Sequence, residues 1–77
     1  MKIVIIGAGE VGFHVAKSLS EIDYDISVID IDHAKCARAN EHLDVIVTQG
    51  NGSDEKILKD VNVAEADYVF CLTNSDE

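Results

Sequence analysis

Apolar residues along the chain fall into two alternating patterns. Four short runs are near-continuous and rich in β-branched residues, which is typical of strands buried on both faces of a parallel sheet. These runs cover residues 2–6, 26–29, 45–47 and 67–73. Between them, apolar positions recur three or four residues apart, which indicates helices with one buried face. The pattern therefore predicts strands and helices in alternation.

Each expected helix has an apolar stripe, and the second and third also have a capping residue. The stripe of the first helix is formed by Val11, Val15, Ala16, Leu19 and Ile22. Asp32 is expected to cap a second helix and Ser53 a third, because such side chains accept hydrogen bonds from the N–H groups of a first turn. The second helix carries Ala34, Ala37 and Arg38, and the third presents Ile57, Leu58 and Val61.

Short connections and right-handed crossovers between these elements predict a parallel sheet with strand order 3-2-1-4. This is an α/β fold, a partial Rossmann-like doubly wound sheet, with residues 1–77 as the N-terminal part of one nucleotide-binding domain. The fourth strand would lie at an open edge, with apolar side chains on both faces. Residues 73–77 resemble the cap and acidic first turn of a further helix, so we expect a fragment of a longer protein.

The composition of the chain limits the kinds of partner that it is expected to bind. The net charge is −9, from 15 acidic residues against 6 Lys and Arg, which disfavours nucleic acid and direct adhesion to an anionic membrane. No apolar stretch approaches the ~20 residues of a bilayer span, and no signal peptide precedes the first strand. A soluble, cytoplasmic protein without direct membrane insertion is expected. Cys36 and Cys71 are interpreted as small, reduced core residues.

A glycine-rich loop directly follows the first strand. Gly7, Gly9 and Gly12 fill the pattern G-x-G-x-x-G in the context strand, loop, helix. The first glycine permits a tight turn, the second lets a pyrophosphate approach the backbone, and the third lets the helix pack closely on the sheet. We expect the loop Gly7, Ala8, Gly9, Glu10 and Val11 to hold phosphates at the helix N-terminus, with the side chain of Glu10 pointing to water.

An acidic residue stands at the end of the second strand. Asp30 follows Gly12 by 18 positions, close to the spacing expected for a carboxylate that binds an adenosine ribose. A 2′-phosphate about 4 Å away would be repelled by roughly 4 kcal/mol per charge pair. The pattern therefore favours NAD(H) over NADP(H), although Lys35 and Arg38 lie near enough in sequence to weaken the preference. The competing interpretation of Asp30 is a simple solvated turn residue.

Further candidates lie in the loops after the third and fourth strands. Asn51 and Gly52 could approach a flat base, although a turn followed by a helix cap explains them equally well. Thr73 and Asn74 follow the fourth strand, at the same end of the sheet. Asp32 is better explained as a cap than as a metal ligand. No residue, the three histidines included, has the partners of a general acid or base, so neither a catalytic nor a metal site is predicted.

Four segments together resemble a known family. They are MKIVIIGAGEVG, VID at residues 28–30, QGNGS at 49–53 and TNSDE at 73–77. In this combination they are similar to the N-terminal domain of TrkA, the regulatory subunit of bacterial Trk potassium-uptake systems, also called KTN or the N-lobe of RCK domains. The glycine loop is shared with many dehydrogenases, whereas the last two segments are more specific.

The resemblance implies regulation rather than catalysis. Family members bind NAD+ or NADH, and often ATP or ADP, and form rings beneath a membrane potassium channel whose gating they control. By position, the loop Gly7 to Val11 would hold the pyrophosphate, Asp30 the ribose and Asn51 with Gly52 the adenine. Thr73 and Asn74 would lie near the other half of the nucleotide. The protein would then be a homo-oligomer, held at the inner face of the membrane by its channel subunit.

The sequence departs from the family pattern at one place, and it also allows one alternative function. Family members often carry a basic residue just after the third glycine, whereas Phe13 and His14 stand here, which disfavours highly charged nucleotides such as ATP. The alternative function is the coenzyme-binding half of an NAD-dependent dehydrogenase, because a dinucleotide fold does not by itself imply hydride transfer. The QGNGS and TNSDE segments favour the regulator.

Overall fold

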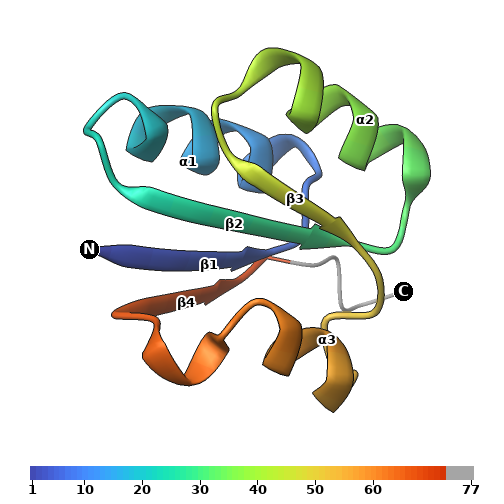
Figure 1. Ribbon diagram of the computed structural model, residues 1–77. Helices are drawn as coiled ribbons and strands as arrows, with labels where there is room; N and C mark the ends of the chain where they lie inside the picture. Colours follow the sequence, from blue (N-terminus) through green and yellow to red (C-terminus); the bar gives the residue numbers. More distant parts are fainter. Residues whose placement is uncertain (73–77) are drawn as a thin grey trace.

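The structure is a four-stranded parallel sheet between two layers of helices. The computed structural model describes residues 1–72. The strands, in the order β3-β2-β1-β4, are β1 (Lys2–Ile6), β2 (Asp25–Asp30), β3 (Ile46–Gln49) and β4 (Tyr68–Cys71). The helices are α1 (Glu10–Ser20), α2 (His33–His42), α3 (Glu55–Asp60) and a 3-10 turn, η1 (Val63–Glu65). Helices α1 and α2 cover one face of the sheet, and α3 lies on the other (Figure 1). The predicted fold class and strand order are confirmed.

The core has two halves because successive side chains of a strand point to opposite faces. Ile3 and Ile5 of β1 pack beneath α1 together with Ala16, whereas Val4 points to the α3 side and packs with Ile29 and Val61. All three β1 side chains are at most 2% exposed. The near-continuous apolar run of β1 thus reflects burial on both faces, as in the centre of other parallel sheets.

The buried face of α1 matches the stripe predicted from spacing only in part: Ala16 is buried, and Val15 and Leu19 pack against the core. Its buried residues are Gly12, Phe13 and Ala16. Val11 and Ile22, both assigned to the stripe, are 62% and 54% exposed. Phe13 is buried instead because Arg38 of α2 covers its ring, 4.0 Å from the centroid. The helix is therefore rotated toward α2, and its Val11 side faces β4.

The caps of α2 and α3 test two further expectations. Asp32 caps α2 as predicted, because its side chain accepts hydrogen bonds from the N–H groups of Ala34 and Lys35. The predicted cap of α3, Ser53, is wrong: Asp54 is the N-cap and accepts from Lys56 N–H at 2.9 Å. The Ser53 hydroxyl donates instead to Asn51 Oδ1 at 2.7 Å. The apolar face of α2 also differs, since Cys36 and Ala39 are its buried residues.

Alanine at the two adjacent positions should distinguish these roles. Asp54→Ala leaves a first-turn N–H of α3 without its carboxylate and should lower the free energy of unfolding by about 1 kcal/mol. Ser53→Ala removes only an exposed hydrogen bond within the loop and should cost a few tenths of that. Urea denaturation followed by circular dichroism compares them, and an equal loss in both variants would contradict the assignment.

The edge strand β4 is more exposed than its composition suggested. It pairs only with β1 among the described strands, and all of its residues are exposed, Tyr68, Val69 and Phe70 by 55%, 47% and 38%. Cys71, expected in the core, is exposed as well. The reason is positional: an apolar run produces a core strand only where neighbouring elements cover both of its faces.

Candidate functional site

The carboxyl ends of the four strands are tied to one another by backbone hydrogen bonds. Gly7 N–H donates to the carbonyl of Ile29 at 2.7 Å, and Gly50 N–H to that of Asp30 at 2.9 Å. Leu72 N–H donates to the carbonyl of Ile6 at 2.8 Å. The pairing of the sheet thus extends one residue past its strands, and the following loops start from fixed positions at one edge. In open α/β sheets this edge is where ligands bind.

Two glycines have the structural roles expected of the fingerprint. Gly7 has φ 113°, a conformation that residues with a side chain rarely adopt, and it turns the chain away from β1. Gly12 packs so closely that a Cβ there would overlap the carbonyl oxygen of Gly7. These two residues let the chain turn out of β1 and let α1 pack closely on the loop.

The N-terminus of α1 is open in the way that a phosphate site requires. Its N-cap is Gly9, so no N-cap side chain accepts hydrogen bonds from the N–H groups of the first turn. A Cβ built on Gly9 would meet no atom within 4 Å. Free space therefore adjoins a helix end that favours anions. The loop fits a pyrophosphate on both counts.

Asp30 is bonded to the glycine loop. Its Oδ2 accepts a hydrogen bond from Ala8 N–H, and its Oδ1 one from Asp32 N–H, both at 2.7 Å. Ala8 is 1% exposed, so its N–H depends on this carboxylate. The sequence suggested a ribose ligand at Asp30 but not the hydrogen bond from Ala8 N–H, which ties the glycine loop to the end of β2 and is called the brace below. A carboxylate has about four lone-pair sites, so two remain for ribose hydroxyls.

The loop after β3 folds over the end of β1. Gly52 lies so near Ile6 that a Cβ would overlap the isoleucine Cγ2, which brings this loop beside the glycine loop. The Oδ1 of Asn51 accepts from Ser53 N–H at 2.9 Å and holds a local turn. Gly7, Ala8, Asp30 and Gly52 are thus brought to one edge of the sheet. Thr73 and Asn74 lie outside the described residues.

A charged contact between α1 and α2 was not foreseen. Glu10 is exposed and its Oε1 pairs with Arg38 Nη1 at 3.1 Å, while its Oε2 lies 3.7 Å from His14 Nε2. Arg38 is also the residue that covers Phe13. Lys35 and Arg38 were expected to weaken the preference of Asp30; in the structure the guanidinium lies against Glu10. The two partners are 28 positions apart in the chain, so no local pattern indicates the pairing.

Cys36 lies beside this edge, and its predicted place in the core is confirmed because the residue is buried. Its Sγ donates to the carbonyl of Asp30 at 3.3 Å. Burial raises the pKa of the Cys36 thiol, and the negative charges of Asp30 and Asp32 raise it further. The thiolate fraction at neutral pH is correspondingly lowered.

Alkylation should therefore distinguish the two cysteines. At pH 8, iodoacetamide is expected to modify the exposed Cys71 at least about ten times faster than Cys36, because burial shields the Cys36 thiol and its raised pKa lowers its thiolate fraction. Mass spectrometry of Cys36→Ser and Cys71→Ser chains gives each rate separately. Equal rates in the folded chains would contradict the burial of Cys36.

Other kinds of site find no support in the described part of the chain. Within residues 1–72, no three His, Cys, Asp or Glu side chains are grouped so as to hold a metal ion. His33 Nδ1 lies 3.1 Å from the side-chain oxygen of Gln49, at the far edge of the sheet from β4. None of the helices in this range is long and apolar enough to span a membrane.

A glycine-rich loop and a carboxylate, at the ends of adjacent parallel strands, are typical of nucleotide-binding domains of the Rossmann-like class. Comparison with known families gives the particular member of that class. The TrkA-N domain family matches residues 3–77, and the chain belongs to it. The family resemblance inferred from the four sequence segments is thereby confirmed.

Curated relatives align with the entire chain. A Trk system potassium uptake protein trkA homolog 1 of Methanosarcina mazei is 49% identical over all 77 residues, which make up 18% of its length. A TrkA homolog of Archaeoglobus fulgidus is 43% identical, and the TrkA protein of Haemophilus influenzae 40%, with the whole chain covering 17% of each. The chain thus spans less than a fifth of the length of these three relatives.

Proposed function

We propose that the chain binds NAD(H), or a related adenine nucleotide such as ATP or ADP, and acts as the nucleotide-sensing part of a regulator of Trk-type potassium uptake. The pyrophosphate would lie on the loop from Gly7 to Val11, and the adenosine ribose on Asp30. Asn51 and Gly52 would adjoin the adenine, with Thr73 and Asn74 near the other half of the nucleotide.

The observation that carries the proposal is the position of the Asp30 carboxylate. It accepts a hydrogen bond from the glycine loop, and it has lone pairs left for two hydroxyl groups. The same negative charge would repel a 2′-phosphate, by roughly 4 kcal/mol per charge pair at about 4 Å. An unphosphorylated ribose therefore fits this edge of the sheet better than the ribose of NADP(H).

Regulation, rather than hydride transfer, is favoured by the relatives. Those that align with the whole chain are named as potassium uptake proteins. In a regulator of this kind, the nucleotide acts as a signal and the domain works through a membrane channel subunit. We propose that the full-length protein assembles as a ring of such domains on the cytoplasmic side of that channel.

Calorimetric titration tests the ligand. We expect NADH to bind at least about tenfold more tightly than NADPH, since tenfold corresponds to only about 1.4 kcal/mol of the calculated repulsion. ATP and ADP are titrated in parallel to compare ligands of different charge. Equal affinities for NADH and NADPH would contradict the assignment of Asp30, and no binding of any of these nucleotides would contradict the proposed ligand.

Potassium uptake tests the biological part of the proposal. Cells that lack the full-length protein should accumulate potassium more slowly than the parent strain, and the intact gene should restore uptake. A gene carrying Asp30→Ala should restore less. Normal uptake in the deletion strain would overturn the regulatory function while leaving nucleotide binding to be judged by calorimetry.

A further inference from the structure

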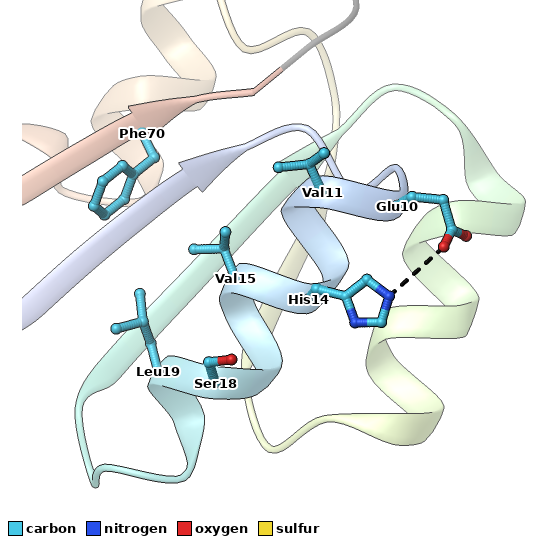
Figure 2. Close-up of a pocket in the computed structure, with 7 residues that line it drawn as sticks. All are labelled: Glu10, Val11, His14, Val15, Ser18, Leu19 and Phe70. Carbon is cyan, nitrogen blue, oxygen red and sulfur yellow. Dashed lines mark ion pairs between the residues drawn. The ribbon is translucent and has the colours of Figure 1, made fainter.

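An apolar groove of about 510 Å³ runs along the side of α1 that faces β4. Figure 2 shows its two walls: Val11, Val15 and Leu19 point from α1 toward Phe70, which points from β4. Val11 is 62% exposed and Phe70 38%. The phenyl ring of Phe70 stacks on Tyr68, with ring centroids 6.3 Å apart, so that a second aromatic side chain extends the β4 wall.

The shape of the α1 wall matches the surface that one helix presents to another. Val11, Val15 and Leu19 follow the i, i+4, i+8 spacing, which forms a continuous ridge along a helix. Eight residues of helix rise about 12 Å, or slightly more than two turns. A second helix with an apolar face of two turns could pack against this ridge and over Phe70. We propose that the groove is the docking site of an amphipathic α-helix.

The crossover rule limits where that helix comes from. The connection from β3 to β4 passes through α3, on the face of the sheet opposite α1 (Figure 1). A right-handed crossover from β4 to a strand beyond it runs in the same direction across the sheet, so its helix would lie on the α3 face. It would cover Val69, which shares the register of the α3-facing Val4, and would leave the groove open.

The occupant is therefore assigned to a later helix of the same polypeptide, one that returns to the α1 face. Relatives such as the Archaeoglobus fulgidus protein have more than four-fifths of their length outside the matching region. Covalent connection raises the effective concentration of such a helix. A helix from a second copy would lack this covalent advantage, and it is the alternative that the experiment below tests. The proposal does not depend on nucleotide binding.

A photo-crosslinking experiment on the full-length protein tests this assignment. The photoreactive residue p-benzoylphenylalanine replaces Ser18, an exposed residue that lines the groove, and in a matched control it replaces Lys17, which lines the hollow between α1 and α2. After irradiation, the Ser18 probe should join to one segment beyond residue 77 of the same chain, with the mass of a single polypeptide. That segment should carry apolar residues at helical spacing, and the Lys17 probe should not capture it.

A surface variant makes the result specific to the groove. Val11→Gln alters a side chain that the domain itself leaves exposed, and it should lower the yield from the Ser18 probe at least about fivefold. His14→Gln, at the exposed polar rim, is the matched substitution and should change the yield little. A product with the mass of two chains, capture of another protein, no product, or an unchanged yield in Val11→Gln would each overturn the proposal.

Discussion

Replacing Gly12 with alanine is expected to be among the most damaging single-methyl additions in this domain. The new Cβ would overlap the carbonyl oxygen of Gly7, which is a backbone atom and has no rotamer by which to move away. Either α1 must shift from the sheet or the glycine loop must distort. Because overpacking of a core typically costs 1–3 kcal/mol and this overlap involves backbone, we expect a loss of about 3 kcal/mol or more.

The same substitution at Gly9 is the matched control. A Cβ there would meet no atom within 4 Å, and Gly9 has an extended backbone conformation that alanine can adopt. Gly9→Ala should therefore unfold at nearly the same urea concentration as the native chain, while Gly12→Ala unfolds at a much lower one. Similar midpoints for the two variants would contradict the close packing of α1 on the loop.

Gly9→Ala also separates stability from binding. Its methyl group would occupy the space through which a pyrophosphate approaches the loop, so nucleotide affinity should fall although the fold is retained. Calorimetry on this variant thus tests the phosphate loop independently of stability. Unchanged affinity for NADH would place the phosphates elsewhere.

Replacing Asp30 with alanine is expected to affect both binding and stability. The buried Ala8 N–H would lose its acceptor, which costs about 1–3 kcal/mol in the free energy of unfolding. A ribose would lose hydrogen bonds to a charged group, each of about 1.5–3 kcal/mol. Affinity for NADH should therefore fall at least about tenfold, and the preference over NADPH should largely disappear.

Asp30→Asn tests the two roles against each other. Asparagine keeps one acceptor oxygen, so it can satisfy Ala8 N–H, but it has no charge to repel a 2′-phosphate. The Asn variant should be more stable than the Ala variant while discriminating equally poorly between NADH and NADPH. Native-like discrimination in either variant would show that another residue selects the ribose.

Local patterns predicted most of this fold because its elements follow one another in the chain. The β-branched runs place β1 and β2 within a residue of their observed bounds, and Asp32 caps α2 through N–H groups only two and three residues away. The glycine spacing likewise indicated the loop. Such features depend on residues that are close together in the sequence, so they can be predicted from a local pattern.

Tertiary contacts decided the features that patterns missed. The burial of Phe13 in place of Val11 depends on Arg38, which is 25 residues further along the chain. The brace between Asp30 and Ala8 spans 22 residues, and the exposure of Cys71 depends on which elements flank β4. Ser53 and Asp54 are both good capping residues, and the competing bond from Ser53 to Asn51 selected the second.

The brace at Asp30 has a consequence for redesign of the domain. In a protein where this carboxylate touched only the ligand, cofactor preference could be exchanged by swapping one side chain for a small or basic one. Here the side chain that would bind the ribose also accepts the hydrogen bond of Ala8 N–H in the glycine loop. An engineer seeking NADP(H) dependence must therefore keep an acceptor for that N–H while removing the negative charge. Cofactor choice and loop shape would have to be altered together.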